Sequence, residues 1–349
     1  MKKVLVTGSA GFIGFHYTKR MLNEGYQVLA IDNLNDYYDV NLKMARLAQL
    51  GLTLNDKVEF VSENPNFSFA KADIENHDEI VRIFSDFNPD YVVHLAAQAG
   101  VRYSLSNPRT YTKSNVEAFL SILEGCRKTN PEHLVFASSS SVYGLNKGYP
   151  FQEDVPTDHA MSLYAATKRA NEIMAHSYAH LYDIPATGLR FFTAYGPWGR
   201  PDMALFIFVK NIIEEKPIQV YNNGEMLRDF TFVDDLVEGI YRTMKTPPSS
   251  NPNYNHQNPI PTESSASYRI LNIGNNAPVK LLDFVYAIEK SLGKKAIIDF
   301  QPLQPGDITQ TYADVTKLQT LTGYKPETDI QDGVDAFVEW YKDYFKVTL

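Results

Sequence analysis

Short apolar runs alternate with longer amphipathic segments through the first half of the chain. The apolar runs predict strands at 3–7, 26–31, 67–72, 90–95, 133–137 and 186–190. Helical periodicity predicts helices between them at 16–24, 40–50, 78–87, 110–129 and 165–182. Because strands that are buried on both faces carry continuous apolar runs, this order predicts an α/β fold with a Rossmann-like, doubly wound parallel sheet.

The second half has a different pattern, in which prolines and asparagines are frequent and the periodic segments are short. Further strands are expected at 56–61, 230–233 and 269–273, and helices at 204–214, 234–244, 281–292 and 330–344. The Pro-, Ser- and Asn-rich stretch 246–267 predicts a loop.

These patterns predict two parts. The first is a cofactor-binding Rossmann-like domain at 1–195, rejoined by segments near 228–245 and 269–275. The remainder of 196–349 is expected to form a smaller mixed α/β C-terminal substrate domain.

Composition excludes some classes of binding partner for this fold. The 349 residues carry a net charge of -8, which argues against nucleic acid or an anionic membrane as the main partner. No apolar run approaches the length that spans a bilayer, so we expect a cytoplasmic protein without a membrane segment. The single cysteine, Cys126, permits no internal disulfide and suits a small core position.

Three glycines mark the turn between the first strand and the first helix. Gly8, Gly11 and Gly14 follow the run 3–7, and the next apolar run ends at Asp32, eighteen residues beyond Gly14. Glycines let the backbone approach a pyrophosphate, which the N-terminus of the following helix also attracts. The Asp32 carboxylate would accept hydrogen bonds from the adenosine ribose and repel a 2′-phosphate, so the pattern predicts NAD rather than NADP.

Two more strands end in residues that suit a bound ring. Asp73 and Ile74 follow the run 67–72 and could hydrogen-bond and sandwich an adenine, although Asp73 is equally suited to cap the helix at 78–87. Ala96 and Ala97 follow the run 90–95, and their small side chains let a flat ring lie close to the backbone.

Four consecutive serines at 138–141 end the next strand and are poised for a ligand. Tyr164 and Lys168 follow, four residues apart on one helix face, where an ammonium can stabilise a proton-abstracting phenolate. The same spacing recurs at Tyr143/Lys147, Tyr241/Lys245 and Tyr286/Lys290. We favour the Tyr164 copy because it follows a hydroxyl-rich strand end and opens a long helix, whereas Gly144 and Asn146 favour a turn in the first of the others.

Other polar residues allow further interpretations. Glu172, His176, His180 and Asp183 share one side of a helix and could hold a metal, but a polar helix face or a dimer seam is favoured because no second cluster supplies ligands. The serines lack the Gly-x-Ser-x-Gly elbow of a serine hydrolase. Arg228 could clamp a phosphate bidentately or lie exposed to solvent, and the sequence leaves both open.

Several of these motifs follow one another in an order that resembles the extended short-chain dehydrogenase/reductase family. They are Gly8/Gly11/Gly14, Asp32, Asp73-Ile74, Leu95-Ala96-Ala97, Asn115, the segment 138–144, Tyr164/Lys168 and Phe191-Phe192. Within that family the segments 32–35, 98–104, 190–193 and 196–204 look like those of UDP-glucuronate 4-epimerases.

The resemblance implies tightly held NAD and a UDP-uronic acid site between the domains. It implies catalytic roles for Tyr164, Lys168, Ser139, Ser140 and Ser141. The implied cofactor contacts add Phe12, Ile13, Asn33, Asn35, Asn115 and Phe191 to the residues already named. The implied substrate contacts are Arg102, Thr193, Arg200, Arg228 and Asp307.

The implied reaction inverts C4 by a double hydride transfer. Tyr164, its pKa lowered by Lys168 and NAD⁺, takes the C4 hydroxyl proton while hydride passes from C4 to the nicotinamide. The 4-keto sugar then turns its other face and takes the hydride back. Ser139 is expected to bridge the sugar oxygen and the tyrosine.

Departures from related subclasses refine the resemblance. Dehydratases of this family carry an Asp-Glu pair where this chain has Ser140-Ser141, and decarboxylases carry an acid at the Ser141 position. A 4-keto uronic acid loses carbon dioxide easily, so we expect Arg200 and Thr193, with Arg102 as a weaker candidate, to anchor its carboxylate. Gln304 stands where galactose-type epimerases usually place an arginine against the diphosphate, which leaves that contact to Arg228.

Two alternative functions remain open. One is 4-epimerisation of neutral UDP-sugars, such as glucose/galactose or the N-acetylhexosamines. The other is a catalytically silent NAD-binding regulator, which the intact Ser139, Tyr164 and Lys168 disfavour. The resemblance also implies a homodimer formed through the helices at 110–129 and 165–182.

Overall fold

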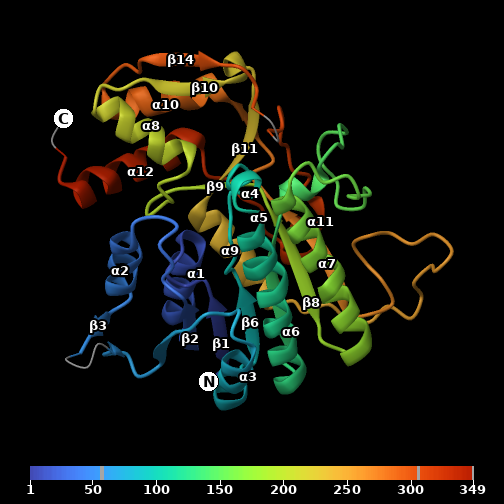
Figure 1. Cartoon of the computed structure of the whole chain (residues 1–349). Coiled ribbons are helices and arrows are strands. Elements are labelled where there is room, and N and C mark those ends of the chain that lie inside the picture. The colour runs from blue at the N-terminus through green and yellow to red at the C-terminus, as the bar shows by residue number, and fades with distance from the viewer. Residues whose placement is uncertain (56–58, 305–306, 348–349) are drawn as a thin grey trace.

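A seven-stranded parallel sheet organises the protein, whose computed structural model describes residues 1–55, 59–304 and 307–347. Its strands lie in the order β12-β8-β7-β6-β1-β2-β5, and every neighbouring pair is parallel. The strands are β1 (Lys3–Thr7), β2 (Gln27–Asp32), β5 (Phe67–Lys71), β6 (Tyr91–His94), β7 (His133–Ser139), β8 (Ala186–Phe191) and β12 (Tyr268–Ile273). Figure 1 shows this sheet in the lower part of the molecule, below most of the C-terminal elements.

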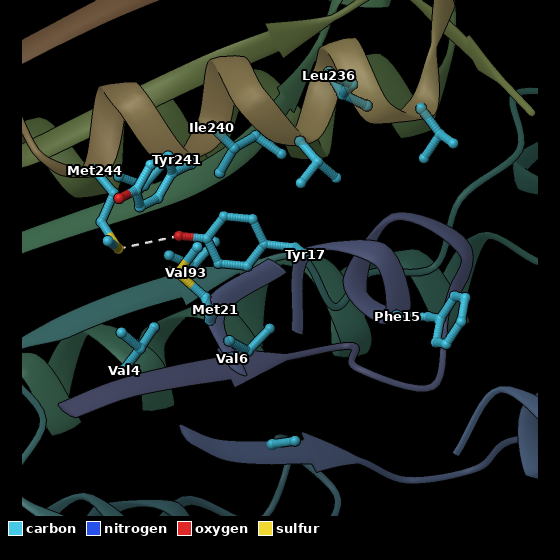
Figure 2. Packing of buried hydrophobic residues seen from close by; sticks show 14 of the residues in the cluster. Val4, Val6, Phe15, Tyr17, Met21, Val93, Leu236, Ile240, Tyr241 and Met244 are labelled. Carbon is cyan, nitrogen blue, oxygen red and sulfur yellow. Dashed lines mark hydrogen bonds between the residues drawn. The ribbon is translucent and has the colours of Figure 1, made fainter. Parts of the chain in front are cut away.

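Helices cover both faces of the sheet. On one face, α1 (Phe12–Asn23) and α9 (Val233–Met244) pack on strand residues such as Val4 and Val6. Figure 2 shows Tyr17 of α1 between these layers, where its hydroxyl donates a hydrogen bond to the Met244 sulfur at 3.0 Å. On the other face lie α3 (His77–Phe87), α6 (Ala118–Thr129) and α7 (Leu163–Tyr182). This arrangement confirms the predicted doubly wound α/β fold.

The helix predicted at 110–129 is a chain of three segments. It begins with α5 (Pro108–Tyr111), continues as a π-helix at Thr112–Glu117 and ends as α6. The short helix α4 (Tyr103–Ser106) precedes it. Such π segments are often found at functional sites, and this one faces the loop that follows β6 through Asn115.

A further hydrophobic cluster lies outside the large sheet. It is formed by α8 (Ala204–Ile213), α10 (Leu281–Leu292) and α12 (Ile330–Phe345), which pack around Phe230 and Phe284. Two small sheets flank it: a parallel pair, β10 (Ile218–Tyr221) with β14 (Ile298–Gln301), and the set β9 (Thr193–Tyr195), β11 (Leu227–Phe232) and β13 (Pro278–Lys280). The small strands, apart from part of β11, were not predicted, because they mix polar and apolar residues and lack the continuous apolar runs of the large sheet.

A few elements differ from the predicted boundaries. Strand β7 extends to Ser139, two residues past its predicted end, and Ser140–Tyr143 form a 3-10 helix. In the region predicted as a strand at 56–61, residues 56–58 lie outside the described residues, and β4 (Phe60–Ser62) pairs antiparallel with β3 (Leu52–Leu54). The remaining helices are α2 (Val40–Gln49) and α11 (Thr316–Thr322), and a 3-10 turn spans Asn222–Gly224.

None of the helices within the described residues is long and apolar enough to cross a bilayer.

Candidate active site

An open cavity of about 370 Å³ lies at the carboxyl ends of the parallel strands. This edge of a doubly wound sheet is where such folds bind their ligands. The structure brings most of the predicted site residues to it: Gly8, Gly11, Phe12, Ile13, Gly14, Asp32, Asn33, Asn35, Asp73, Ile74, Leu95, Ala96, Ala97, Ser139, Ser140, Ser141, Tyr164, Lys168, Phe191, Thr193 and Arg200.

The glycine turn is packed too tightly for side chains. A Cβ on Gly14 would lie 2.0 Å from the carbonyl oxygen of Gly8, and one on Gly8 would lie 2.7 Å from the backbone nitrogen of Ala96. Gly11 is the N-cap of α1 and provides no side chain to bond the free backbone N–H groups of the first turn. The turn therefore forms a cradle that suits a pyrophosphate.

Asp32 at the end of β2 is held by the backbone around it. Its carboxylate accepts hydrogen bonds from the backbone N–H groups of Ala10 at 3.1 Å and Leu34 at 2.8 Å. The ammonium of Lys43 lies 4.0 Å away and donates to the Asn35 side chain at 2.9 Å. Burial lowers the pKa of Lys43, whereas the neighbouring Asp32 opposes that shift. An acid and a cation thus lie together where the sequence predicts the adenosine ribose.

Asp73 does not cap the helix that follows it. The N-cap of α3 is Asn76, whose side chain accepts a hydrogen bond from the backbone N–H of Glu79. Asp73 instead accepts from the backbone N–H of Glu75 at 3.0 Å and from the Asn33 amide at 3.2 Å. The helix-cap interpretation of Asp73 is therefore wrong, and its carboxylate lines the cavity beside Ile74.

Tyr164 and Lys168 are placed in the cavity by the first turn of α7. The Ser162 side chain caps this helix by accepting a hydrogen bond from the backbone N–H of Ala165 at 3.1 Å. Lys168 donates to the carbonyl oxygen of Ala137 on β7 at 2.8 Å. Among the described residues, the other Tyr-x-x-x-Lys pairs do not line this cavity. Tyr143, for example, is fully buried and bonds Asn272.

Burial has the largest effect on the pKa values of both members of this pair. Burial raises the pKa of Tyr164, and a hydrogen bond with Ser139 and the charge of Arg200 only partly oppose it. Burial lowers the pKa of Lys168 to about 8. In the polypeptide without NAD⁺, desolvation of the phenolate outweighs the nearby charges, whereas the expected lowering of the Tyr164 pKa by Lys168 and bound NAD⁺ together stays a prediction.

Glu172 belongs to a buried ion-pair network and not to a metal site. It pairs with Arg190 through both oxygens at 2.9 and 3.0 Å, and with Arg169 at 2.9 Å. Burial alone would raise the pKa of Glu172, but these arginines and a hydrogen bond from Ser138 lower it. The metal hypothesis for this helix is therefore wrong, and no cluster of three possible metal ligands occurs within the described residues. The network instead fixes Ser138 at the end of β7.

Asn115 lies behind the cavity rather than on its wall. Its side chain accepts a hydrogen bond from the backbone N–H of Gln98 at 2.8 Å and donates to the Gln98 carbonyl and the Thr167 hydroxyl, both at 3.0 Å. These bonds use both ends of the amide. Asn115 therefore joins the loop after β6 to α7, and the structure does not bring it to the cavity surface as expected.

Arg200 enters the cavity from the loop that precedes α8. Its guanidinium pairs with Asp202 at 2.7 Å, and 23% of the side-chain surface is exposed to solvent. Burial disfavours the charge of Arg200, but the carboxylate of Asp202 outweighs it and raises the pKa. Thr193, at the start of β9, lies on the same wall.

Arg102, Arg228 and Asp307 gather at a second place, outside this cavity. Arg102 pairs with Asp307 at 2.7 Å and lies over the ring of Tyr221, 4.2 Å from its centroid. Arg228 on β11 is half-buried, and burial lowers its pKa while Asp307 opposes the shift. The interpretation of Arg228 as a fully exposed side chain is therefore wrong. The structure also places Arg102 away from Tyr164, where it was a weaker candidate for holding the substrate carboxylate.

The cavity also contains residues that were not predicted from the sequence. They include Tyr37, Tyr38, Lys43, Gln98, Ser114 and Met203. The first three belong to the polar, irregular stretch after Asp32, where their only signal was closeness in sequence to the predicted ribose-binding acid.

Comparisons with known proteins show which sequences and structures this chain is similar to. The model of the NAD dependent epimerase/dehydratase family matches residues 4–256. The probable UDP-glucuronate 4-epimerase of Rhizobium meliloti (strain 1021) is 45% identical over 345 residues, covering 99% of this chain and 98% of that protein.

Two solved structures are also similar. UDP-glucuronic acid 4-epimerase from Bacillus cereus, in complex with UDP-glucuronic acid and NAD, has a TM-score of 0.84 and 32% identity, covering 98% of this chain and 99% of that chain. UDP-glucose 4-epimerase from Thermotoga maritima, with UDP-glucose, has a TM-score of 0.81 and 27% identity over the same shares.

The matched region contains the glycine turn, Asp32 and the Tyr164/Lys168 pair, which the fold brings to one cavity. This confirms the resemblance to the extended short-chain dehydrogenase/reductase family. The chain belongs to the NAD dependent epimerase/dehydratase family.

Proposed function

We propose that this protein is an NAD-dependent isomerase that interconverts UDP-glucuronate and UDP-galacturonate by inverting C4 of the sugar. The observation that carries this proposal is the set of groups near Tyr164: the guanidinium of Arg200, the Thr193 hydroxyl and the serines at 139–141. Among the described lining residues, the carboxylates are Asp32 and Asp73, which belong to the cofactor end. A cation with several hydroxyls suits a sugar that carries a carboxylate.

The other end of the cavity fits NAD. The glycine cradle would hold the pyrophosphate, Asp32 with Lys43 the adenosine ribose, Asp73 and Ile74 the adenine, and Lys168 the nicotinamide ribose. NAD held there would supply a hydride acceptor and donor for C4 of the sugar. Asn115 supports this end indirectly, through the loop after β6.

Tyr164 acts as the proton acceptor for the C4 hydroxyl and gives the proton back after inversion. Because burial raises its pKa, positive charge is needed to stabilise the phenolate. Arg200 supplies part of that charge, and a cationic nicotinamide in this cavity would act in the same direction. The Ser139 hydroxyl would bridge Tyr164 and the sugar oxygen.

The same residues explain why epimerisation is favoured over loss of carbon dioxide. A 4-keto uronic acid is a β-keto acid, so a site that only epimerises must hold its carboxylate and withhold a proton from the enolate. Arg200 and Thr193 would hold the carboxylate, while Ser140 and Ser141 stand where related dehydratases and decarboxylases have acids.

The second cluster would bind the nucleotide part of the substrate. Arg228 and Arg102 are two cations beside Asp307 and the Tyr221 ring. We assign the diphosphate to both arginines, which makes up for Gln304, and the uridine ribose to Asp307.

Incubating the purified protein with a panel of UDP-sugars and following C4 by NMR tests the proposal. We expect UDP-glucuronate and UDP-galacturonate to interconvert with kcat/KM at least about tenfold above that for UDP-glucose or UDP-N-acetylglucosamine. Faster turnover of a neutral sugar would favour the alternative that the likeness to the Thermotoga maritima UDP-glucose 4-epimerase supports. Absence of any turnover with NAD bound would favour the regulator.

We also propose an oligomeric state, a cellular place and a division of the chain into two parts. They are a homodimer through α6 and α7, a place in the cytoplasm and in polysaccharide biosynthesis, and division into an NAD-binding part and a sugar-binding part. The dimer is supported by the exposed Leu120 of α6 and Ile173 and Leu181 of α7. A monomeric mass by light scattering would contradict it.

A further inference from the structure

Asp202 occupies one of the two edges through which the Arg200 guanidinium can bind a carboxylate. The Nε of Arg200 donates to Asp202 Oδ1 at 2.9 Å, and Nη2 donates to Oδ2 at 2.7 Å. Among the described residues, none accepts a hydrogen bond from Nη1. A substrate carboxylate in this cavity would therefore meet a guanidinium whose charge Asp202 partly offsets and whose Nε/Nη2 edge is already used, so that the remaining N–H groups of Nη1 and Nη2 are left to bind it.

Asp202 is itself held from the cofactor end of the cavity. The hydroxyl of Tyr37 donates to Asp202 Oδ2 at 3.2 Å. Tyr37 belongs to the segment after Asp32, and its ring packs against Tyr103 with centroids 5.0 Å apart. Arg200 cannot leave its position without breaking its own ion pair with Asp202, which this second contact keeps in place.

The backbone of the same loop is fixed by a buried arginine. Arg46 of α2 is fully buried and donates to the carbonyl oxygens of Trp198 at 2.7 Å and of Ala10 in the glycine turn at 2.8 Å. It thereby ties the loop that carries Arg200 and Asp202 to the glycine turn. Both the backbone and the side chain of this loop are therefore preorganised.

The proposed reaction gives this arrangement a purpose, and the inference rests on that function. Between the two hydride transfers the 4-keto sugar must turn over, so its carboxylate cannot stay locked in one pose. A free guanidinium would bind a carboxylate bidentately, in one strong and directional arrangement. We propose that Asp202 is a positioning residue that limits the hold of Arg200 on the substrate carboxylate, so that the keto sugar can turn inside the cavity.

Asp202→Asn tests this because it keeps the size of the side chain and one acceptor but removes its charge. Binding of UDP-glucuronate is measured by calorimetry in a Tyr164→Phe background, where turnover does not disturb the measurement. We expect the Asp202→Asn substitution to lower Kd about fivefold and, in the single variant, to lower kcat about tenfold, while Kd for UDP-glucose changes less than about twofold. Reduced cofactor should accumulate during turnover, because the sugar stalls after the first transfer.

Two tyrosine variants serve as a graded test and a matched control. Tyr37→Phe removes only the hydroxyl that holds Asp202, and we expect the same changes at about twofold. Tyr103→Phe alters the ring that packs on Tyr37, but its hydroxyl bonds none of the described residues, so binding and kcat should stay unchanged. If Asp202→Asn fails to fold, Tyr37→Phe decides alone.

The outcomes distinguish a failure of the proposed role of Asp202 from a failure of the proposed function. Wild-type protein that leaves UDP-glucuronate unchanged contradicts the proposed function. Wild-type turnover together with unchanged or weaker binding in Asp202→Asn, or in Tyr37→Phe if that variant alone folds, overturns only the role of Asp202. Tighter binding with slower turnover supports it, whereas a merely structural role would weaken both.

Discussion

The two ends of the cavity are built in different ways. The cofactor end consists largely of one local turn, from Gly8 to Gly14, and of residues that directly follow strands, such as Asp32 and Asp73. The sugar end is assembled from side chains of separate segments, with Tyr164 from α7, Ser139 from β7 and Arg200 from the loop before α8. An anion and a flat ring can be held by backbone geometry, whereas a reacting sugar needs side chains that only the fold brings together.

The largest effect is expected when the proton acceptor is removed from the sugar end while the cofactor end is left intact. Tyr164→Phe should lower kcat about 10³-fold, because a positioned proton acceptor contributes on that order. NAD affinity by calorimetry should stay within about threefold. A large loss of NAD binding would show that the two ends are not separable.

Lys168 lies where the two ends of the cavity meet. Because its pKa is shifted by folding, it makes the unfolding free energy depend on pH. Burial lowers that pKa from 10.5 to about 8. Between these values the unfolded chain holds the proton and the folded chain does not, so Lys168 makes the unfolding free energy rise with pH. Relative to Lys168→Met, nucleotide-free wild type should gain about 3 kcal/mol across this window, measured by urea titration.

A surface lysine provides the control for that measurement. Lys147 is exposed, so Lys147→Met should follow wild type at every pH. A flat difference between wild type and Lys168→Met would show that Lys168 keeps its proton in the folded protein.

Arg200→Ala sharpens the contrast between charged and neutral sugars. Loss of a charge-assisted contact costs about 2 kcal/mol, so KM for UDP-glucuronate should rise about thirtyfold while KM for UDP-glucose stays the same. A UDP-pentose should appear among the products, because the keto acid is no longer held. Unchanged affinity without that product would contradict the assignment of Arg200.

The cofactor end is tested at its tightest point. The Cβ of Gly14→Ala would meet the backbone oxygen of Gly8, so the turn must shift at a cost of about 2 kcal/mol. We expect NAD to bind at least about tenfold more weakly by calorimetry, with UDP affinity unchanged. Gly148→Ala is the control, since nothing lies within 4 Å of its added carbon.

The smallest effect is expected at the nucleotide cluster. Arg102 is partly exposed and paired with Asp307, and such ion pairs are worth up to about 1 kcal/mol. Arg102→Ala should therefore raise KM about fivefold, equally for UDP-glucuronate and UDP-glucose, with kcat unchanged. An effect on UDP-glucuronate alone would indicate that Arg102 contacts the sugar carboxylate and not the diphosphate.

Features that depend on neighbours in sequence were predicted well. The parallel strands, the glycine turn and the Tyr164/Lys168 spacing follow from local patterns. The role of Glu172 was not predicted, because its helical spacing matches a polar surface and only the fold places Arg190 against it. The family resemblance implied a cofactor contact for Asn115, but the fold directs its side chain to Gln98 and Thr167, and these bonds cannot be seen in the sequence.

The sequence by itself determined the α/β fold, the cradle for NAD and the residues capable of the chemistry, because periodicity, glycines and strand ends act over a few residues. The tertiary structure decided which of the candidates share a cavity. It placed Arg200 beside Tyr164 and paired it with Asp202, which Tyr37 also contacts, and it paired Arg102 with Asp307. These contacts join segments far apart in the chain, so their geometry exists only after the sheet and its helices have packed.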